Sequence, residues 1–341
     1  MKKLTSWIRD HPLASFFIIT FAITWGLGFS YGAFYKGQFL MAPLAFLATC
    51  GPALAGIIIS AVSNTQPRQG THKAFWIAFF AAWVVSALVC IAGITILYHA
   101  AFSPVLIGFT FVMVVPVAFV IGATHSRIPA VRIYLSSLIR LRGVWGWALL
   151  ALVLFPATTL LSILICSLLG GQPIAGHQFQ ETGLALIGLV TVKFFYQFFF
   201  FNATGEETGW RGFALPRLQA RTNPLVASLI ISIFWINWHW FLWQAEGNPV
   251  FSWQYWIVQY ALHIPASVII GWFYNRSKGS ILVAGIAHAA ANTADGFFKL
   301  DSTVFPLTLV FVALLLILVD RMWKKLPSDH PAVYQVSALD G

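Results

Sequence analysis

The sequence predicts an all-α fold, a polytopic bundle of about ten transmembrane helices, from three observations. The chain is 59% hydrophobic and 9% charged, whereas soluble domains average about 25% charged residues. Apolar runs of roughly 20 residues, long enough to cross a bilayer, recur along most of the chain. These runs are apolar on all sides, and a helix satisfies its own backbone hydrogen bonds inside lipid.

The expected helices begin with the run 13–35, which is too long for a signal-peptide core and lacks a clear cleavage site. We therefore interpret it as a retained helix. The full set of expected spans is 13–35, 42–62, 74–98, 104–123, 144–169, 183–205, 224–243, 253–274, 280–297 and 303–322.

The distribution of basic residues predicts how these helices are oriented. A net charge of +10 could suggest nucleic acid as a partner, but the bases lie between apolar runs. With the amino terminus in the cytoplasm, seventeen of the twenty bases fall in inside segments, and only Lys36 and Lys299 fall in outside loops. The sequence thus predicts a multi-pass protein of the plasma (cytoplasmic) membrane with both termini in the cytoplasm. Its expected partner is the lipid bilayer, with no nucleic acid.

Two further features allow more than one interpretation. The basic segment 125–143 could be an amphipathic helix at the inner membrane surface or an ordinary loop. Cys50, Cys90 and Cys166 lie within apolar runs without a CxxC pair, so no disulfide framework is expected.

A pair of acids follows the apolar run KFFYQFFFF, within the sequence FNATGEETGWRG. The chain has only ten acidic residues, and Glu206 and Glu207 are two of them. Neighbours on a helix point about 100° apart, so one acid is expected to face a site and the other to brace it. Arg211 follows Glu207 by four residues, a spacing that allows an ion pair. Alternatively, the cluster only anchors the end of the helix.

Polar side chains also interrupt two later apolar helices. His239 lies in FWINWHWFLW, four residues after Trp235, where it could be either a site residue or part of an aromatic belt. His288 and Asn292 form AHAAAN and share one helix face. The small residues around this pair could serve close helix packing alone.

Together, these groups could carry out hydrolysis. Two histidines and a carboxylate can hold zinc with an open position for water. A buried glutamate can instead act directly as general base on water, with Asn and His stabilising the oxyanion. Three other ionisable groups at membrane depth have simpler interpretations. His263 would support the bend at Pro265, Lys193 would snorkel or form an ion pair, and Asp295 would be a partner of the site or a helix cap.

These motifs resemble the CPBP family of intramembrane proteases, which includes type II CaaX prenyl endopeptidases and Abi-type proteins linked to bacteriocin self-immunity. The family pattern is EExxxR, then FxxxH, then HxxxN. EETGWR and HAAAN match in full, whereas WINWH has tryptophan where phenylalanine is usual. The resemblance covers roughly residues 183 to 297.

The resemblance implies a role for each matching residue. It implies a membrane-embedded endopeptidase in which Glu206 activates water, His239 and His288 are its partners and Asn292 holds the oxyanion. Glu207 and Arg211 would orient the first glutamate. The resemblance allows two mechanisms: one uses zinc held by Glu206, His239 and His288, and the other uses no metal.

The resemblance also implies a substrate and a division of the chain. The substrate would be a peptide or membrane-associated protein, with prenylated substrates included, cleaved near the cytoplasmic face in a cavity that opens toward the cytoplasm. Residues 1–182 would be scaffold helices, 183–300 the protease core and 301–341 the last helix with a cytoplasmic tail. Two other functions use the same cavity: a non-enzymatic immunity protein that binds a partner, and a transporter with proton-relaying side chains.

Overall fold

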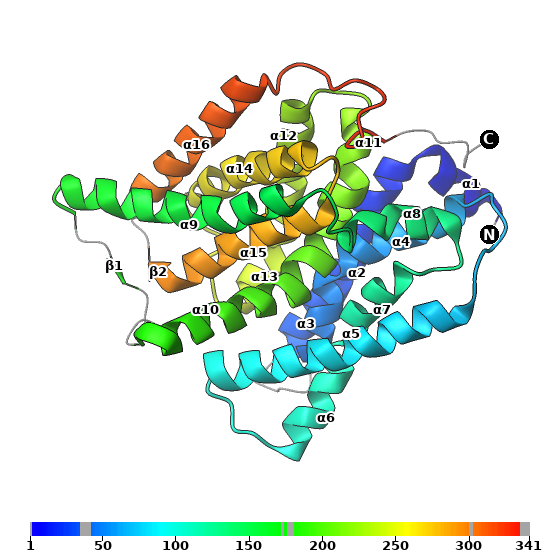
Figure 1. Ribbon diagram of the computed structural model, residues 1–341, viewed down its shortest axis with the longest axis horizontal. Coiled ribbons are helices and arrows are strands. Elements are labelled where there is room, and N and C mark those ends of the chain that lie inside the picture. The colour runs from blue at the N-terminus through cyan, green and yellow to red at the C-terminus, as the bar shows by residue number, and fades with distance from the viewer. Residues whose placement is uncertain (1, 35–41, 172–173, 176–180, 300–302, 335–341) are drawn as a thin grey trace.

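The structure, a computed structural model, describes residues 2–34, 42–171, 174–175, 181–299 and 303–334. Within these ranges the fold is helical, apart from two paired segments of two residues each (Figure 1). Strands β1 (Ile174–Ala175) and β2 (Phe298–Lys299) pair antiparallel, with Ile174 opposite Lys299. The predicted all-helical, polytopic architecture is confirmed.

The amino-terminal half begins with a sharp bend. The axis of Lys3–Asp10 makes an angle of 111° with that of Pro12–Gly28. Pro12, which cannot donate a backbone hydrogen bond, begins the second helix at the bend. The elements of this half are α1 (Lys2–Asp10), α2 (Pro12–Phe34), α3 (Ala42–Thr49), α4 (Gly51–Ser63), α5 (His72–Ala92), the π-helix η2 (Gly93–Leu97), α6 (Pro104–Met113), α7 (Val115–Ala123), α8 (Pro129–Leu135), the 3₁₀ turn η3 (Ser136–Leu138) and α9 (Trp145–Leu168).

The carboxyl-terminal half contains one unusually long helical stretch, from Gly183 to Gln219. The sequence predicted an end at residue 205, but the helix continues past Arg211 through two π-helical segments. The elements of this half are α10 (Gly183–Gln197), the π-helices η4 (Phe198–Glu207) and η5 (Trp210–Ala214), α11 (Leu215–Gln219), α12 (Pro224–Trp238), α13 (Trp240–Ala245), α14 (Trp253–Arg276), α15 (Ile281–Phe297) and α16 (Val304–Asp320).

The number of spans differs in detail from the sequence-based expectation. Among the described residues, six helices are long and apolar enough to cross a membrane, or seven if the bent α1–α2 pair counts as one span. The expected span 42–62 is broken at Cys50 into α3 and α4. Helices α15 and α16 have 17 residues each, about 26 Å at 1.5 Å per residue, somewhat less than a ~30 Å hydrocarbon core.

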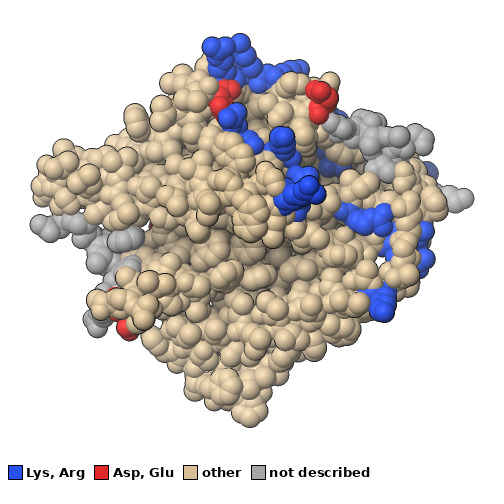
Figure 2. Space-filling view, in the orientation of Figure 1, with Lys and Arg blue, Asp and Glu red and all other residues tan. Residues whose placement is uncertain are grey.

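Lipid-facing and basic surfaces lie in different places. Large apolar side chains such as Leu149, Leu168 and Leu318 are exposed along the outer helices, as expected of surfaces that face lipid. Figure 2 shows lysine and arginine at the top and right of the visible face, near the two termini, and none at its left and bottom. This asymmetry agrees with the positive-inside pattern of the sequence.

Segment α8, within the basic stretch 125–143, is a short helix. Val131 and Leu135 are buried, whereas Ile133 is exposed on the other side. Residues 129–138 of this stretch are therefore helical, and their place at the inner membrane surface stays a prediction.

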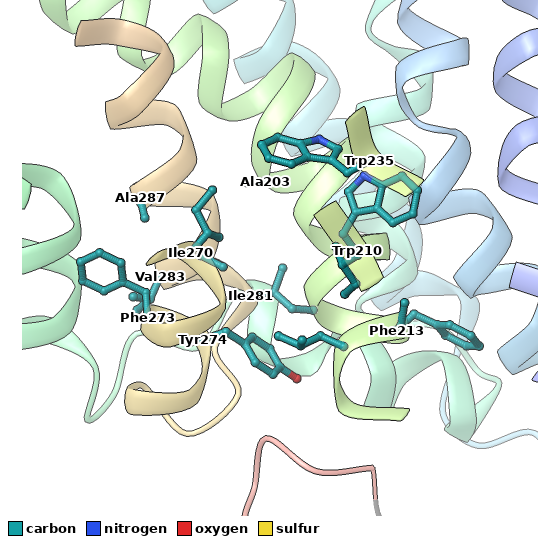
Figure 3. Close-up of a cluster of buried hydrophobic side chains, with 14 of the residues drawn as sticks. Ala203, Trp210, Phe213, Trp235, Ile270, Phe273, Tyr274, Ile281, Val283 and Ala287 are labelled. Atoms are coloured by element: carbon teal, nitrogen blue, oxygen red, sulfur yellow. The ribbon is translucent and has the colours of Figure 1, made fainter. Parts of the chain in front are cut away.

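The core packs around the long helix. Figure 3 shows Trp210 of this helix near Trp235 of α12 and Ile281 of α15, whereas the ring of Phe213 points away from them. The ring of Phe213 stacks instead on Phe16 of α2, with ring centroids 5.2 Å apart. Gly209 allows a close approach, because a Cβ atom there would lie 2.3 Å from Cβ of Pro52. Helices α4 and α15 therefore hold the long helix from two sides.

Candidate active site

The acidic pair lies in the π-helical part of the long helix. The hydroxyl of Thr208 donates to the carbonyl of Ala203 at 2.6 Å, five residues back, and Thr204 donates in the same way to Phe199. These contacts follow the i→i+5 spacing of a π-helix, which occurs frequently at functional sites. Because a π turn holds more residues than an α turn, Glu206 and Glu207 are closer in direction than the 100° of an α-helix. Both are buried, with 4% and 0% of their surface exposed.

Glu207 lies at the centre of a buried network. Its Oε1 accepts hydrogen bonds from Nη1 of Arg211 and Nδ1 of His288, both at 2.8 Å. Nη2 of Arg211 donates to Oγ of Ser267 at 3.1 Å, and its guanidinium lies 5.1 Å from the ring of Trp235. The charge of each partner is thus matched inside the protein, and the network holds three helices together.

Glu206 faces a cavity instead. Its Oε2 accepts a hydrogen bond from the indole Nε1 of Trp235. The same oxygen lies 3.7 Å from Nε2 of His239. Glu206, His239, His288 and Asn292 line this cavity, and Glu207 and Arg211 lie behind it. Their catalytic roles remain predictions.

Hydrogen bonding determines which nitrogen of His239 carries the proton. Nδ1 lies 2.8 Å from the carbonyl oxygen of Trp235, which can only accept, so Nδ1 must carry hydrogen. In the neutral ring, Nε2 is then an acceptor that faces a carboxylate oxygen of Glu206. Two acceptors 3.7 Å apart need a proton or a water molecule between them.

Asn292 and one residue that the sequence interpretation missed complete the polar lining. Nδ2 of Asn292 donates to Oδ1 of the buried Asn202 at 3.4 Å. His263, interpreted from sequence as a residue near a bend, lines the cavity, with its ring centroid 5.6 Å from that of His239. Its position opposite His239 depends on how α14 packs against α12, which the spacing within one helix cannot reveal. Lys193 and Asp295 line the same cavity.

The cavity has a volume of about 550 Å³ and opens at one end of the bundle. Three residues of its lining are exposed at helix ends: Tyr98 after η2, Glu246 after α13, and Asp295 near the end of α15. Seven residues separate His239 from Glu246, roughly 10 Å along a helix. The polar site is therefore recessed by a few helical turns.

This mouth lies away from the basic end of the bundle. Helix α5 begins beside Lys73, α12 follows Arg221 and α15 follows Lys278. Helices α5 and α15 lead to the mouth at their other ends, and α12 leads there through α13, which Glu246 follows. The stretch His72–Leu97 alone has 26 residues, about 39 Å of helix. The mouth is thus at the end opposite to the expected, basic end, and the side of the membrane that each end faces stays a prediction. The difference arises because Glu206 lies near the middle of a 37-residue helix and not at the inner end of a shorter one.

The predicted zinc ligands do not form a metal site in this arrangement. Over the ranges that the structure describes, no three histidine, cysteine, aspartate or glutamate side chains are placed to hold a metal ion together. Nδ1 of His288 contacts Glu207, the acid behind the cavity, and not Glu206. We therefore derive no catalytic step through a metal.

Fold and site together define an integral membrane protein that encloses an acid–base cluster inside its helical bundle. Residues 188–294 match the family model of Rce1-like type II CAAX prenyl endopeptidases, and all six predicted site residues lie within this match. This region of the chain is similar to that family.

A curated relative supports the assignment. CAAX prenyl protease 2 of Methanococcus maripaludis is 32% identical over 177 residues, which cover 50% of this chain and 64% of that protein. The chain therefore spans just under two thirds of the length of this relative.

Proposed function

We propose that the protein is an intramembrane endopeptidase in which Glu206 activates a water molecule. The observation that carries this proposal is the 3.7 Å gap between Oε2 of Glu206 and Nε2 of His239. Both atoms are acceptors, and the gap is short enough for one water molecule to donate one O–H to each. Such a water is held at the cavity by two fixed groups, which is the geometry that general-base catalysis needs.

The buried network would then position the other groups. Because Glu207 contacts Nδ1 of His288 at 2.8 Å, the ring of His288 is held with its second nitrogen available to the cavity side. With Asn292, the ring of His288 would stabilise the oxyanion that forms at the scissile carbonyl. Removing a single oxyanion donor costs about 10²–10³ in kcat in other hydrolases.

The reaction balances without a further reactant. The water oxygen attacks the carbonyl carbon while Glu206 takes one proton. The carbon–nitrogen bond then breaks, and the proton on Glu206 passes to the leaving amine. Protonation of the amine restores the Glu206 carboxylate for the next water.

The position of the mouth bears on the substrate. The proposed orientation puts the basic end of the bundle in the cytoplasm. A peptide would then enter from the opposite side of the membrane, past Tyr98, Glu246 and Asp295. We infer that the substrate is a peptide or membrane-associated protein whose scissile bond lies about 10 Å below that face.

The test is peptide cleavage in proteoliposomes by the native protein, by Glu206→Gln and by Glu246→Gln. We expect Glu206→Gln to lower kcat by about 10²–10⁴, the range of general-base catalysis. Glu246→Gln removes an equal charge from the mouth and should retain activity within a few-fold. Full activity of Glu206→Gln would refute the mechanism. An immunity protein that acts by binding alone would keep its protective effect in Glu206→Gln cells.

A further inference from the structure

A second cavity lies at the opposite, basic end of the bundle. It has a volume of about 890 Å³, and no described residue lines both this cavity and the Glu206 cavity. Five bases and one acid line it: Arg9, Arg140, Arg217, Arg221, Lys278 and Asp10. The positive charge and the size of this cavity fit a large anionic ligand.

The arginines are held in place by backbone and ring contacts. Nε of Arg9 donates to the carbonyl of Val62 at 2.9 Å, and Nη2 of Arg140 donates to that of Lys278 at 3.2 Å. The guanidinium of Arg217 lies 3.7 Å from the ring centroid of Phe213 and 3.8 Å from that of Tyr334. These contacts fix the orientation of the guanidinium groups.

The walls are partly apolar, which distinguishes this cavity from a site for a free ion. Leu13, Ile59 and Ile133 line it together with hydroxyl groups such as those of Ser60 and Ser137. A volume near 890 Å³ is about thirty times the ~30 Å³ share of one water molecule in the liquid. A phosphate with its attached glycerol and the first part of an acyl chain would use both the bases and the apolar wall.

The cavity also lies where a lipid headgroup would be found. Helix α1 crosses the bundle end after its 111° bend, and Trp7 and Leu4 on it are exposed, as in helices that lie in the membrane interface. Basic pockets between transmembrane helices on the cytoplasmic side bind anionic headgroups. We propose that this cavity binds the phosphate-containing headgroup of an anionic phospholipid.

The long helical stretch Gly183–Gln219, which carries Glu206, lines part of this basic cavity. Gly212, which follows Arg211, lines the cavity, and the hydroxyl of Tyr134 donates to the carbonyl of Thr208 at 2.7 Å. A bound headgroup would therefore contact the same helix that carries Glu206, from the opposite end. This proposal concerns binding and holds whether or not the protein cleaves peptides.

The test measures binding of phosphatidylglycerol and phosphatidylcholine to the purified full chain in detergent by native mass spectrometry. The pocket variant is Arg140→Gln/Arg221→Gln/Lys278→Gln. Each base near an anionic lipid contributes about fivefold in affinity, so the variant should bind phosphatidylglycerol roughly 100-fold more weakly. The matched control Arg68→Gln/Lys324→Gln/Lys325→Gln removes three exposed bases from the same end and should bind within about threefold of the native chain.

Three results would overturn the proposal. The first is native protein that binds both lipids equally. The second is a control variant that loses as much affinity as the pocket variant. The third is inorganic phosphate that displaces phosphatidylglycerol at equal concentration, which would indicate a free-anion site. If the triple variant does not fold, the single variant Arg221→Gln should still bind about fivefold more weakly, and unchanged binding would count against the proposal.

Discussion

Replacing Glu207 by glutamine should separate the stability of the site from its chemistry. Arg211 is 1% exposed and Glu207 is not exposed, so water cannot screen either charge. Glutamine keeps the shape of the side chain but leaves the guanidinium of Arg211 as an uncompensated buried charge. Breaking a buried ion pair in this way costs about 3–5 kcal/mol, and we expect Glu207→Gln to lower the free energy of unfolding by that amount.

The double variant Glu207→Gln/Arg211→Met should recover much of this loss. Methionine removes the unpaired charge and fills a similar volume, and replacing a buried pair by apolar groups is often neutral. Peptide cleavage should nevertheless stay low, because His288 loses the carboxylate that orients its ring at 2.8 Å. We therefore expect the double variant to recover stability without recovering peptide cleavage.

The assay is equilibrium unfolding in mild detergent for the native chain, both single variants and the double variant. Each single variant leaves one buried charge unpaired, at about 3–5 kcal/mol, and the double variant leaves none. The coupling energy of this cycle should therefore exceed about 3 kcal/mol, the upper end usually seen for residues in one network. A Glu207→Gln variant that loses less than about 1 kcal/mol would refute the reasoning. So would single-variant losses that simply add in the double variant.

Three further outcomes follow from the same geometry. Trp235→Phe removes the N–H donor to Glu206 but keeps an aromatic wall, so steady-state kinetics should show kcat reduced about tenfold, the loss of one hydrogen bond to a charged group. Gly209→Ala places a methyl group against α4 and should cost about 1–3 kcal/mol in detergent unfolding, whereas Gly188→Ala, where a Cβ has open space, should not destabilise the chain. Two single-cysteine variants in a cysteine-free background test the orientation: Tyr255→Cys at the mouth and Ser137→Cys in the basic cavity. In intact cells, a membrane-impermeant thiol reagent should label Tyr255→Cys and not Ser137→Cys. The reverse pattern would contradict the proposed orientation.

Local spacing predicted the parts of the site that lie within one helix. The i, i+4 relation of Glu207 and Arg211 gives the observed ion pair, and the shared face of His288 and Asn292 places both at the cavity. The sequence also indicated that one acid would face the site while its neighbour braced it, which agrees with the observed positions. Such relations depend on helical periodicity alone.

Relations between helices could not be obtained in this way. His263 reaches the cavity only through the packing of α14 on α12, and its sequence context is that of an ordinary core residue. The indole N–H of Trp235 donates to Glu206 on the long helix, a contact that spacing within α12 does not predict. The phenylalanine usual in the family could not make this bond.

The membrane topology was predictable only in part. The helical bundle follows from composition, and the bias of basic residues is visible as one basic end of the structure (Figure 2). The division into 1–182, 183–300 and 301–341 stays a prediction. Helix α4 packs directly against the π-helical segment of the core, so the amino-terminal helices contribute to the surroundings of the site.

The π-helical turns between Phe198 and Ala214 make the length of this segment as important as its residue types. Deleting one residue ahead of Glu206 would rotate every later side chain on the helix by about 100° relative to the earlier ones. The carboxylates and the guanidinium would keep their mutual spacing yet turn away from the imidazoles of α12 and α15. Variants that shorten or lengthen this stretch would thus preserve the EExxxR motif in an alignment while losing the constellation that the motif represents.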